Sequence, residues 1–253
     1  MILFSMLVLG LVLGFVGAGG AGIVIAVLTA AFDVPIHTAL GTSLAAMIFT
    51  TLSGIFGHFR EENVAIRSGL AVGVFGAAGA LLGVRIATLL PSDDLRQLTG
   101  WMLFLSAGLL WLRIIYAARV IDRRKDDGPT PGGSHFWICA LGVGLVSGVL
   151  SGTFGIGAAP FIQIGLLVYF GLTLPQVAGT TMLVTLPIAL MGGIGYLTAG
   201  YLDMHLFIKV VVGLMTGSYV GSKFTRRLPQ SVLKIAMISV PVIGGMLLVF
   251  GHR

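Results

Sequence analysis

Residues 1–32 read MILFSMLVLGLVLGFVGAGGAGIVIAVLTAAF, and residues 136–170 read FWICALGVGLVSGVLSGTFGIGAAPFIQIGLLVYF. Both stretches are almost wholly apolar, and both are rich in glycine near their centres. As straight helices they would measure about 48 and 52 Å at 1.5 Å per residue. The hydrocarbon core of a bilayer is only about 30 Å thick. We therefore expect each stretch to break at its glycines.

Six further apolar stretches are between 20 and 27 residues long, which suits single membrane-spanning helices. They cover residues 38–58, 64–90, 95–118, 177–199, 204–224 and 231–251. Only 9% of the 253 residues are charged and 57% are hydrophobic, whereas soluble domains carry about 25% charged residues. The sequence therefore predicts an all-α integral membrane protein.

The chain also repeats itself at an offset of 138 residues, without a gap. Nine pairs of glycines coincide at this offset, well above chance for 38 glycines in 253 residues. Gly41-Thr42-Ser43 falls on Gly179-Thr180-Thr181, and Pro91 falls on Pro229. We expect two transmembrane repeats, 1–118 and 136–253, joined by the charged linker 119–135. Internal repeats of this kind are typical of secondary transporters.

The basic residues predict how the two repeats are oriented. The net charge is +6, and the basic residues fall between the apolar stretches, which indicates membrane topology rather than nucleic-acid binding. If the two long stretches fold back as hairpins, eleven of the 15 Lys and Arg lie on one face, together with the linker. The positive-inside rule then favours a cytoplasmic linker. A hairpin plus three spans is an odd unit, so we expect inverted repeats.

The candidate binding site lies at the two hairpin tips. Breaking a helix inside a membrane frees backbone N–H groups, which are tolerated where they line a cavity. The helix starts near residues 20 and 158 would attract an anion through their N–H groups and the helix dipole. The expected tip residues are Gly17, Gly19, Gly20, Ala21 and Gly22 in the first hairpin, and Gly155, Gly157, Ala158 and Ala159 in the second.

Polar side chains near the tips are further candidates. The hydroxyls of Thr42, Ser43, Thr180 and Thr181 could donate to an anion, or could bond to their own helix and serve packing. Gln163 in the second hairpin could reach the same ligand. Candidates for the pathway or for coupling are Asp33, His58, Arg85, Tyr196 and Lys223. For Arg85 and Lys223 the alternative is an interfacial position, with the charge at the headgroups.

The sequence offers no sign of enzyme chemistry, of a cofactor or of a metal. Cys139 is the single cysteine, and all nine acidic residues lie in or beside loops. We therefore expect a transporter of small anions that works by alternating access. An anion channel of the same fold, or a membrane subunit that anchors a partner protein, stays open as an alternative. The anchor is disfavoured because the linker is the only extended soluble segment. A homo-oligomer also stays open.

These glycine-rich hairpins, the repeated Gly-Thr-Ser and Gly-Thr-Thr steps and the central charged linker resemble the TauE/SafE family of sulfite and organosulfonate exporters. The resemblance covers almost the whole chain. It implies export of sulfite, sulfoacetate or related organosulfonates across the bacterial cytoplasmic membrane. Pro160 stands where the repeat places Gly22, so we expect the two halves of the site to differ.

Overall fold

The protein is all-helical in the part of the chain that the computed structural model describes, which is every residue except 17–20, 61–63, 121–132, 157, 226–229 and 252–253. In chain order the helices are α1 (Ile2–Val16), α2 (Ala21–Phe32), α3 (Ile36–Arg60), α4 (Ile66–Leu89), α5 (Ser92–Val120), α6 (Ser134–Phe154), α7 (Ala159–Tyr169), α8 (Leu174–Thr198), α9 (Met204–Thr225) and α10 (Gln230–Phe250). This confirms the predicted helical class.

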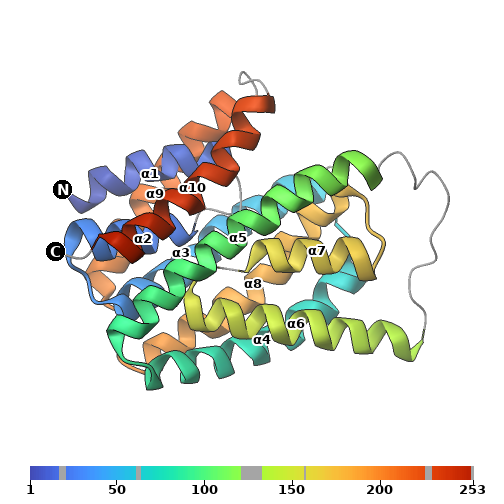
Figure 1. Cartoon of the computed structure of the whole chain (residues 1–253), viewed down its shortest axis with the longest axis horizontal. Helices are drawn as coiled ribbons and strands as arrows, with labels where there is room; N and C mark the ends of the chain where they lie inside the picture. The colour runs from blue at the N-terminus through green and yellow to red at the C-terminus, as the bar shows by residue number, and fades with distance from the viewer. Residues whose placement is uncertain (17–20, 61–63, 121–132, 157, 226–229, 252–253) are drawn as a thin grey trace.

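Both long apolar stretches break where their glycines predict. The first divides into α1 and α2, and the second divides into α6 and α7. In Figure 1, α2 runs back beside α1 toward the end of the molecule where the N-terminus lies. Helix α7 likewise runs back toward the end where α6 begins, which is the opposite end. Each stretch therefore forms two helices of opposite direction instead of one overlong rod.

Three helical segments among the described residues are long and apolar enough to cross a membrane by length and composition: Ile66–Leu89, Ser134–Phe154 and Pro175–Thr198. Six further apolar segments, in α1, α2, α3, α7, α9 and α10, are shorter. Every stretch that the sequence predicts as a single span is covered by one helix. Helix α5 extends to Val120, slightly beyond the predicted start of the linker, and the rest of the linker lies mostly outside the described residues.

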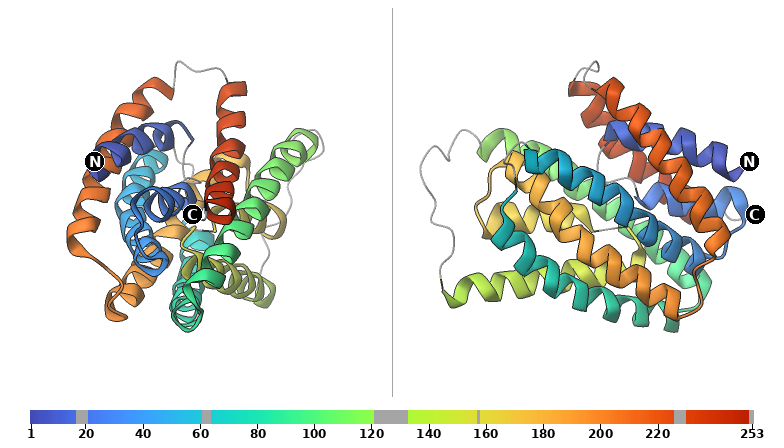
Figure 2. Two further views of the ribbon diagram at one scale, coloured as in Figure 1. Left: turned by 60° about the vertical axis from the view of Figure 1, so that its left-hand side comes forward. Right: turned by 180° about the vertical axis from the view of Figure 1, so that it is seen from behind.

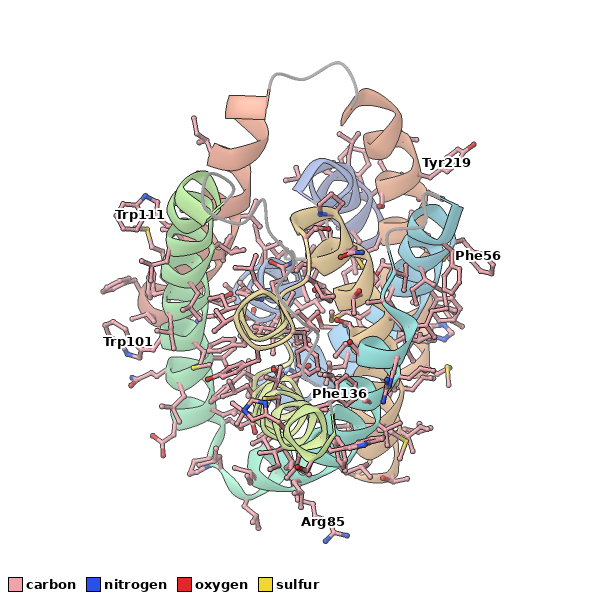
Figure 3. The ribbon with its side chains drawn as sticks, turned by 90° about the vertical axis from the view of Figure 1, so that its right-hand side faces the viewer. Phe56, Arg85, Trp101, Trp111, Phe136 and Tyr219 are labelled. Carbon is pink, nitrogen blue, oxygen red and sulfur yellow. The ribbon has the colours of Figure 1, made fainter. Side chains whose placement is uncertain are left out.

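The outer surface is apolar, as a bilayer requires. Large hydrophobic side chains point outward from several helices, and Figure 3 shows Phe56, Trp101, Trp111 and Tyr219 doing so. Phe56 and Trp101 are 74% and 60% exposed, values that water would penalise and lipid would not. The fold thus presents an apolar belt to its surroundings.

The first arm of each hairpin packs on the other half of the chain. Helix α1 lies along α9, and α6 lies along α4. The remaining contacts are also reciprocal, since α2 packs on α10 and α7 packs on α5, while α3 meets α8 and α5 meets α10. Figure 2 shows these pairs from two further sides. Exchanging the two halves therefore turns each of these contacts into another one in the same set.

Glycines allow these helix pairs to approach backbone to backbone. A Cβ added at Gly79 would lie 2.5 Å from the carbonyl oxygen of Leu145, and one at Gly10 would lie 2.6 Å from that of Leu214. A Cβ at Gly148 would strike the backbone of Gly76 directly. Gly10, Gly79 and Gly217 were expected to serve helix packing, and each meets the backbone of a neighbouring helix.

This packing predicts the outcome of a single substitution. Gly148→Ala should lower the free energy of unfolding by about 1–3 kcal/mol, because the added methyl group forces α4 and α6 apart. Thermal unfolding in detergent would measure the change. Gly142→Ala is the control on the same helix, since a Cβ there meets nothing within 4 Å. Equal stability of the two variants would mean that the close contact carries no energy.

Candidate functional site

The tip of the second hairpin has an unusual backbone. Helix α6 ends at Gly155, which adopts the left-handed conformation with φ +66°, and its N–H donates to the carbonyl of Ser151. Ala158, just before α7, has φ +43°, a left-handed conformation that costs a residue with a side chain roughly 1–2 kcal/mol. Such strained residues cluster at functional sites. Gly157 lies between them, outside the described residues.

The start of α7 offers few free donors. Pro160 has no N–H, and the N–H groups of Phe161 and Ile162 donate to the carbonyl of Ala158 at 3.0 and 3.1 Å. The amides of Ala158 and Ala159 precede these bonds in the chain. Both residues are buried, so their N–H groups point into the interior of the protein and not into lipid. The second tip can therefore present an anion with a small set of backbone donors.

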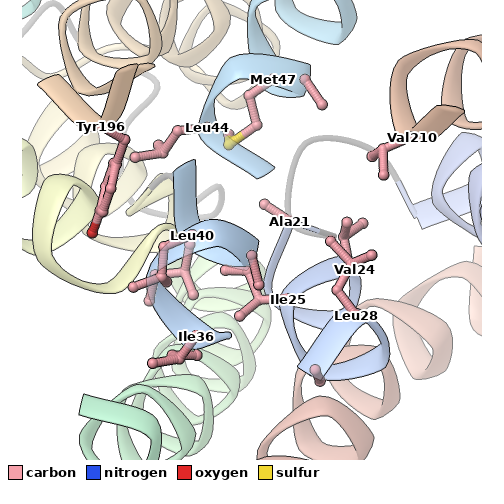
Figure 4. Close-up of a cluster of buried hydrophobic side chains, with 14 of the residues drawn as sticks. Ala21, Val24, Ile25, Leu28, Ile36, Leu40, Leu44, Met47, Tyr196 and Val210 are labelled. Carbon is pink, nitrogen blue, oxygen red and sulfur yellow. The ribbon is translucent and has the colours of Figure 1, made fainter. Parts of the chain in front are cut away.

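The second tip packs against the first hairpin. A Cβ at Gly155 would lie 2.7 Å from Cδ2 of Leu40 and 3.0 Å from Cδ1 of Ile25, which belongs to α2. Ile25 is one turn after Ala21, where α2 begins. Figure 4 shows Ala21, Ile25 and Leu40 in one buried cluster with Tyr196. The start of α2 and the end of α6 thus meet near the centre of the fold, while Gly17, Gly19 and Gly20 lie outside the described residues.

Tyr196 holds the second hairpin in place. Its side chain is fully buried, and its hydroxyl donates to the carbonyl of Gly152 at 3.0 Å. Gly152 is in the last turn of α6, immediately before the tip. The sequence offers Tyr196 as a pathway residue, and the structure gives it this bond at the edge of the tip region.

The four candidate hydroxyls are all buried but are bonded differently. Ser43 donates to the carbonyl of Ala21 at 3.3 Å, which ties α3 to the start of α2. Thr181 donates to Val177 within its own helix at 2.6 Å, the bond that the sequence gave as the alternative to ligand binding. Thr180 accepts a bond from the N–H of Ala65 at 2.9 Å. Thr42 finds no partner among the described residues.

The other predicted residues are spread through the fold. Gln163 is buried in the second turn of α7, close to the second tip. Asp33 and Arg85 are exposed, Asp33 between α2 and α3 and Arg85 near the end of α4, and Figure 3 shows Arg85 at the periphery. His58 and Lys223 belong to α3 and α9, but their side chains are outside the described residues.

Two polar residues escape the reasoning from sequence. Ser151, one turn before Gly155, is fully buried, and its hydroxyl has no partner in the described part of the chain. His37 is buried, with Nε2 3.0 Å from the carbonyl oxygen of Ala87, and its ring stacks on Tyr201 at 4.8 Å. The repeat pairs Ser151 with Leu13 and His37 with Pro175, so the comparison of the two halves passes over both.

The chemistry of the region suits an anion held without a formal positive charge. Helices α2 and α7 contain no Lys or Arg. No group of His, Cys, Asp or Glu that could hold a metal occurs among the residues the structure describes. What the region offers is backbone N–H groups, helix starts and hydroxyls, which are the means by which proteins bind oxyanions inside a low-dielectric interior.

Apolar outward-facing helices and two hairpins whose helices start inside the protein define a class, the integral membrane transporters. The chain belongs to the TauE/SafE sulfite exporter family, whose model matches residues 2–248. The predicted resemblance is confirmed, and so is the expectation of a membrane transporter rather than an enzyme.

Similar proteins carry the same general description. The chain is 49% identical over 250 residues to the probable membrane transporter protein YdhB of Bacillus subtilis, covering 99% of this chain and 100% of that one. It is 27% identical to the probable membrane transporter protein YunE of Bacillus subtilis, covering 97% and 96%. A probable membrane transporter protein of Methanocaldococcus jannaschii, MJ0441, is 24% identical, covering 93% and 91%. No solved structure matches.

The tip geometry predicts a difference between two glycines. Gly155→Ala should destabilise the protein by more than the roughly 1–2 kcal/mol that a left-handed conformation costs, because the methyl group also meets Leu40. Gly200→Ala is the control: Gly200 has φ +80°, but a Cβ there meets nothing within 4 Å. Thermal unfolding of both variants separates the cost of the contact from that of the backbone. A smaller loss in Gly155→Ala than in Gly200→Ala would contradict the packed tip.

Proposed function

We propose that this protein exports small sulfur-containing anions, such as sulfite, sulfoacetate or related organosulfonates, across the bacterial cytoplasmic membrane. It is a multi-pass carrier that works by alternating access around the two hairpin tips. The observation that carries the proposal is the contact between the left-handed turn at Gly155 and Ile25 of α2, which brings the two broken helices together. Membership of the sulfite exporter family supports the substrate class.

The proposed transport cycle depends on inverted repeats, 1–118 and 136–253, related by a near-twofold axis in the membrane plane. The reciprocal helix contacts support this relation, because exchanging the halves preserves them. The direction of the chain in Figure 1 supports it too, since both termini lie at one end and the linker connects α5 to α6 at the other. The linker 119–135 is cytoplasmic in this proposal, because eleven of 15 basic residues belong to that end.

The anion is bound chiefly by backbone in this proposal. A sulfonate or sulfite carries its charge on oxygens that can accept several N–H bonds at once, and helix starts supply such donors together with a favourable dipole. Ser43 and Thr181 belong to helices that pack on α2 and α7, so a modest movement would turn their hydroxyls toward the ligand. Gln163 adds an amide on the side of the second tip, where the first tip has the apolar Ile25 at the equivalent position.

The charged residues at the two ends serve entry and coupling in this proposal. Arg85 is exposed near the end of α4 and would gather anions at one mouth, with Lys223 as its counterpart in α9. Asp33 and His58 are the candidates for coupling to protons. The partners are a small anion and the lipid bilayer, with a homo-oligomer left open and no nucleic acid.

Transport by the purified protein in liposomes tests the proposal directly. Sulfite, sulfoacetate, taurine, sulfate and acetate would be supplied in turn, and uptake would be followed against concentration. A carrier should saturate and should show competition among the anions that it accepts. Voltage-driven flux without saturation would instead favour the anion channel, and absence of flux or binding for every sulfur anion would contradict the proposed substrate class.

The backbone site predicts a strong effect of substitutions at the tips. Gly19→Val and Gly157→Val should abolish transport, because a β-branched side chain fills the space of the ligand oxygens and restricts the backbone. Transport in liposomes and anion binding to the folded variant are the two measurements.

The control for the tip variants is Gly79→Val, in the packed pair of α4 and α6. It should lower stability more than it lowers anion affinity in the protein that stays folded. An anion found bound against Arg85 or Lys223, and not at the tips, would place the site elsewhere.

A further inference from the structure

The two halves of the chain start their fourth helices in the same way. Ala65 precedes α4, and its carbonyl accepts a bond from the N–H of Gly69 at 2.9 Å. At the offset of 138 residues, Asp203 precedes α9, and its carbonyl accepts a bond from the N–H of Phe207 at 2.8 Å. Ala65 and Asp203 are therefore equivalent in structure as well as in the sequence repeat.

Thr180 and Thr42 are the hydroxyls that belong to these two helix starts. Thr180 lies beside α4, since a Cβ at Gly69 would be 3.3 Å from its Cγ2, and its Oγ1 accepts the N–H of Ala65 at 2.9 Å. Next to Thr42, a Cβ at Gly41 would lie 3.3 Å from the carbonyl oxygen of Tyr201, so α3 runs beside the connection that leads to Asp203. The bond equivalent to that of Thr180 would join Thr42 to the N–H of Asp203.

That equivalent bond is missing. Thr42 is fully buried, and its Oγ1 has no partner among the residues described. Buried hydroxyls in proteins are rarely left in this state, because the loss of water is then not compensated. The contact between α3 and the connection before α9 is thus in place, whereas the hydrogen bond that would complete it is not.

Thr42 also forgoes the usual local solution. Other buried threonines in these helices donate to the carbonyl four residues earlier in their own helix: Thr29, Thr51, Thr99, Thr181 and Thr185. Thr42 does not, although it lies inside α3 where such a bond is available. Its hydroxyl is therefore directed away from its own helix, as that of Thr180 is.

We propose that Thr180 and Thr42 are a pair of alternating latches, one at each end of the molecule. In the present state Thr180 holds the α3–α4 connection at the linker end, and Thr42 is released. In the opposite state Thr42 accepts the N–H of Asp203 and Thr180 lets Ala65 go. The proposal rests on the proposed exchange between two inverted halves, and it gives these threonines a gating role in place of ligand binding.

The latches predict effects of opposite sign. Thr180→Val removes the acceptor used in the present state, so it favours the opposite state. Thr42→Val removes an unsatisfied hydroxyl from the present state and the acceptor from the opposite one, so it favours the present state. Each shift in the ratio of the two states should be about fivefold, the effect of one hydrogen bond of ordinary net strength. The double variant should return close to the wild-type ratio.

Hydrogen exchange of the intact protein in lipid nanodiscs, followed by mass spectrometry, measures these shifts at both ends. Thr180→Val should speed exchange at residues 64–68 and slow it at residues 201–205, at the other end of the bundle. Thr42→Val should slow exchange at 64–68. The effect at the distant end is the decisive reading, because loss of a merely structural bond would loosen only its own surroundings.

Matched variants keep the test interpretable. Thr51→Val and Thr185→Val remove buried hydroxyls from the same two helices, but these bond only within their own helix, so neither should change the distant end. Thr42→Ser and Thr180→Ser keep the hydroxyl and should behave like the wild type.

Two results would overturn the latches: purely local loosening in both valine variants, or weaker binding of sulfite by Thr42→Val with hydrogen exchange unchanged at both ends. Sulfite binding and flux are measured separately in the wild type. Opposite shifts in a protein that binds no sulfur anion would sink the proposed substrate and leave the latches standing.

Discussion

The backbone contact between α4 and α6, and its counterpart between α1 and α9, is the interaction on which the rest of the structure depends. In lipid the hydrophobic effect does not drive helices together, so close van der Waals packing must do so. Glycine permits it here, since a Cβ at Gly79 or Gly10 would reach a carbonyl oxygen of the facing helix. With the first arm of each hairpin held in this way, the second arms α2 and α7 can start inside the protein, where their free N–H groups are sheltered from lipid.

The polar groups of the interior divide into those that build the fold and those with bonding capacity to spare. Tyr196 and Ser43 are committed to the carbonyls of Gly152 and Ala21, on the two sides of the region where the hairpins meet. The hydroxyls of Thr42 and Ser151 carry unused capacity among the described residues. Because an unsatisfied hydroxyl is costly in a low-dielectric interior, such groups mark places where the present arrangement is one of several.

Much of the architecture could be predicted from the sequence because it follows from length and from glycine. A stretch too long for the bilayer must break, and the breaks after Val16 and Phe154 fall at the expected glycines. Hydrogen-bond partners could not be predicted. The repeat gives Thr42 and Thr180 equal standing, and only the folded arrangement reveals that Thr180 alone meets a backbone N–H. His37 was missed because its partner, the carbonyl of Ala87, is fifty residues away in the chain.

The exchange of the first arms between the halves also sets the order in which the protein can be assembled during synthesis. Helix α1 is made first, yet the helix it packs along, α9, begins only at Met204. At 5–20 residues per second, roughly 10–40 s pass before that partner leaves the ribosome. Throughout that interval the glycine face of α1 has only lipid or another protein to rest on. A nascent chain that stops after α8 would keep α6 correctly seated on α4 and leave α1 unpaired, which makes the N-terminus a natural point for quality control of incomplete chains.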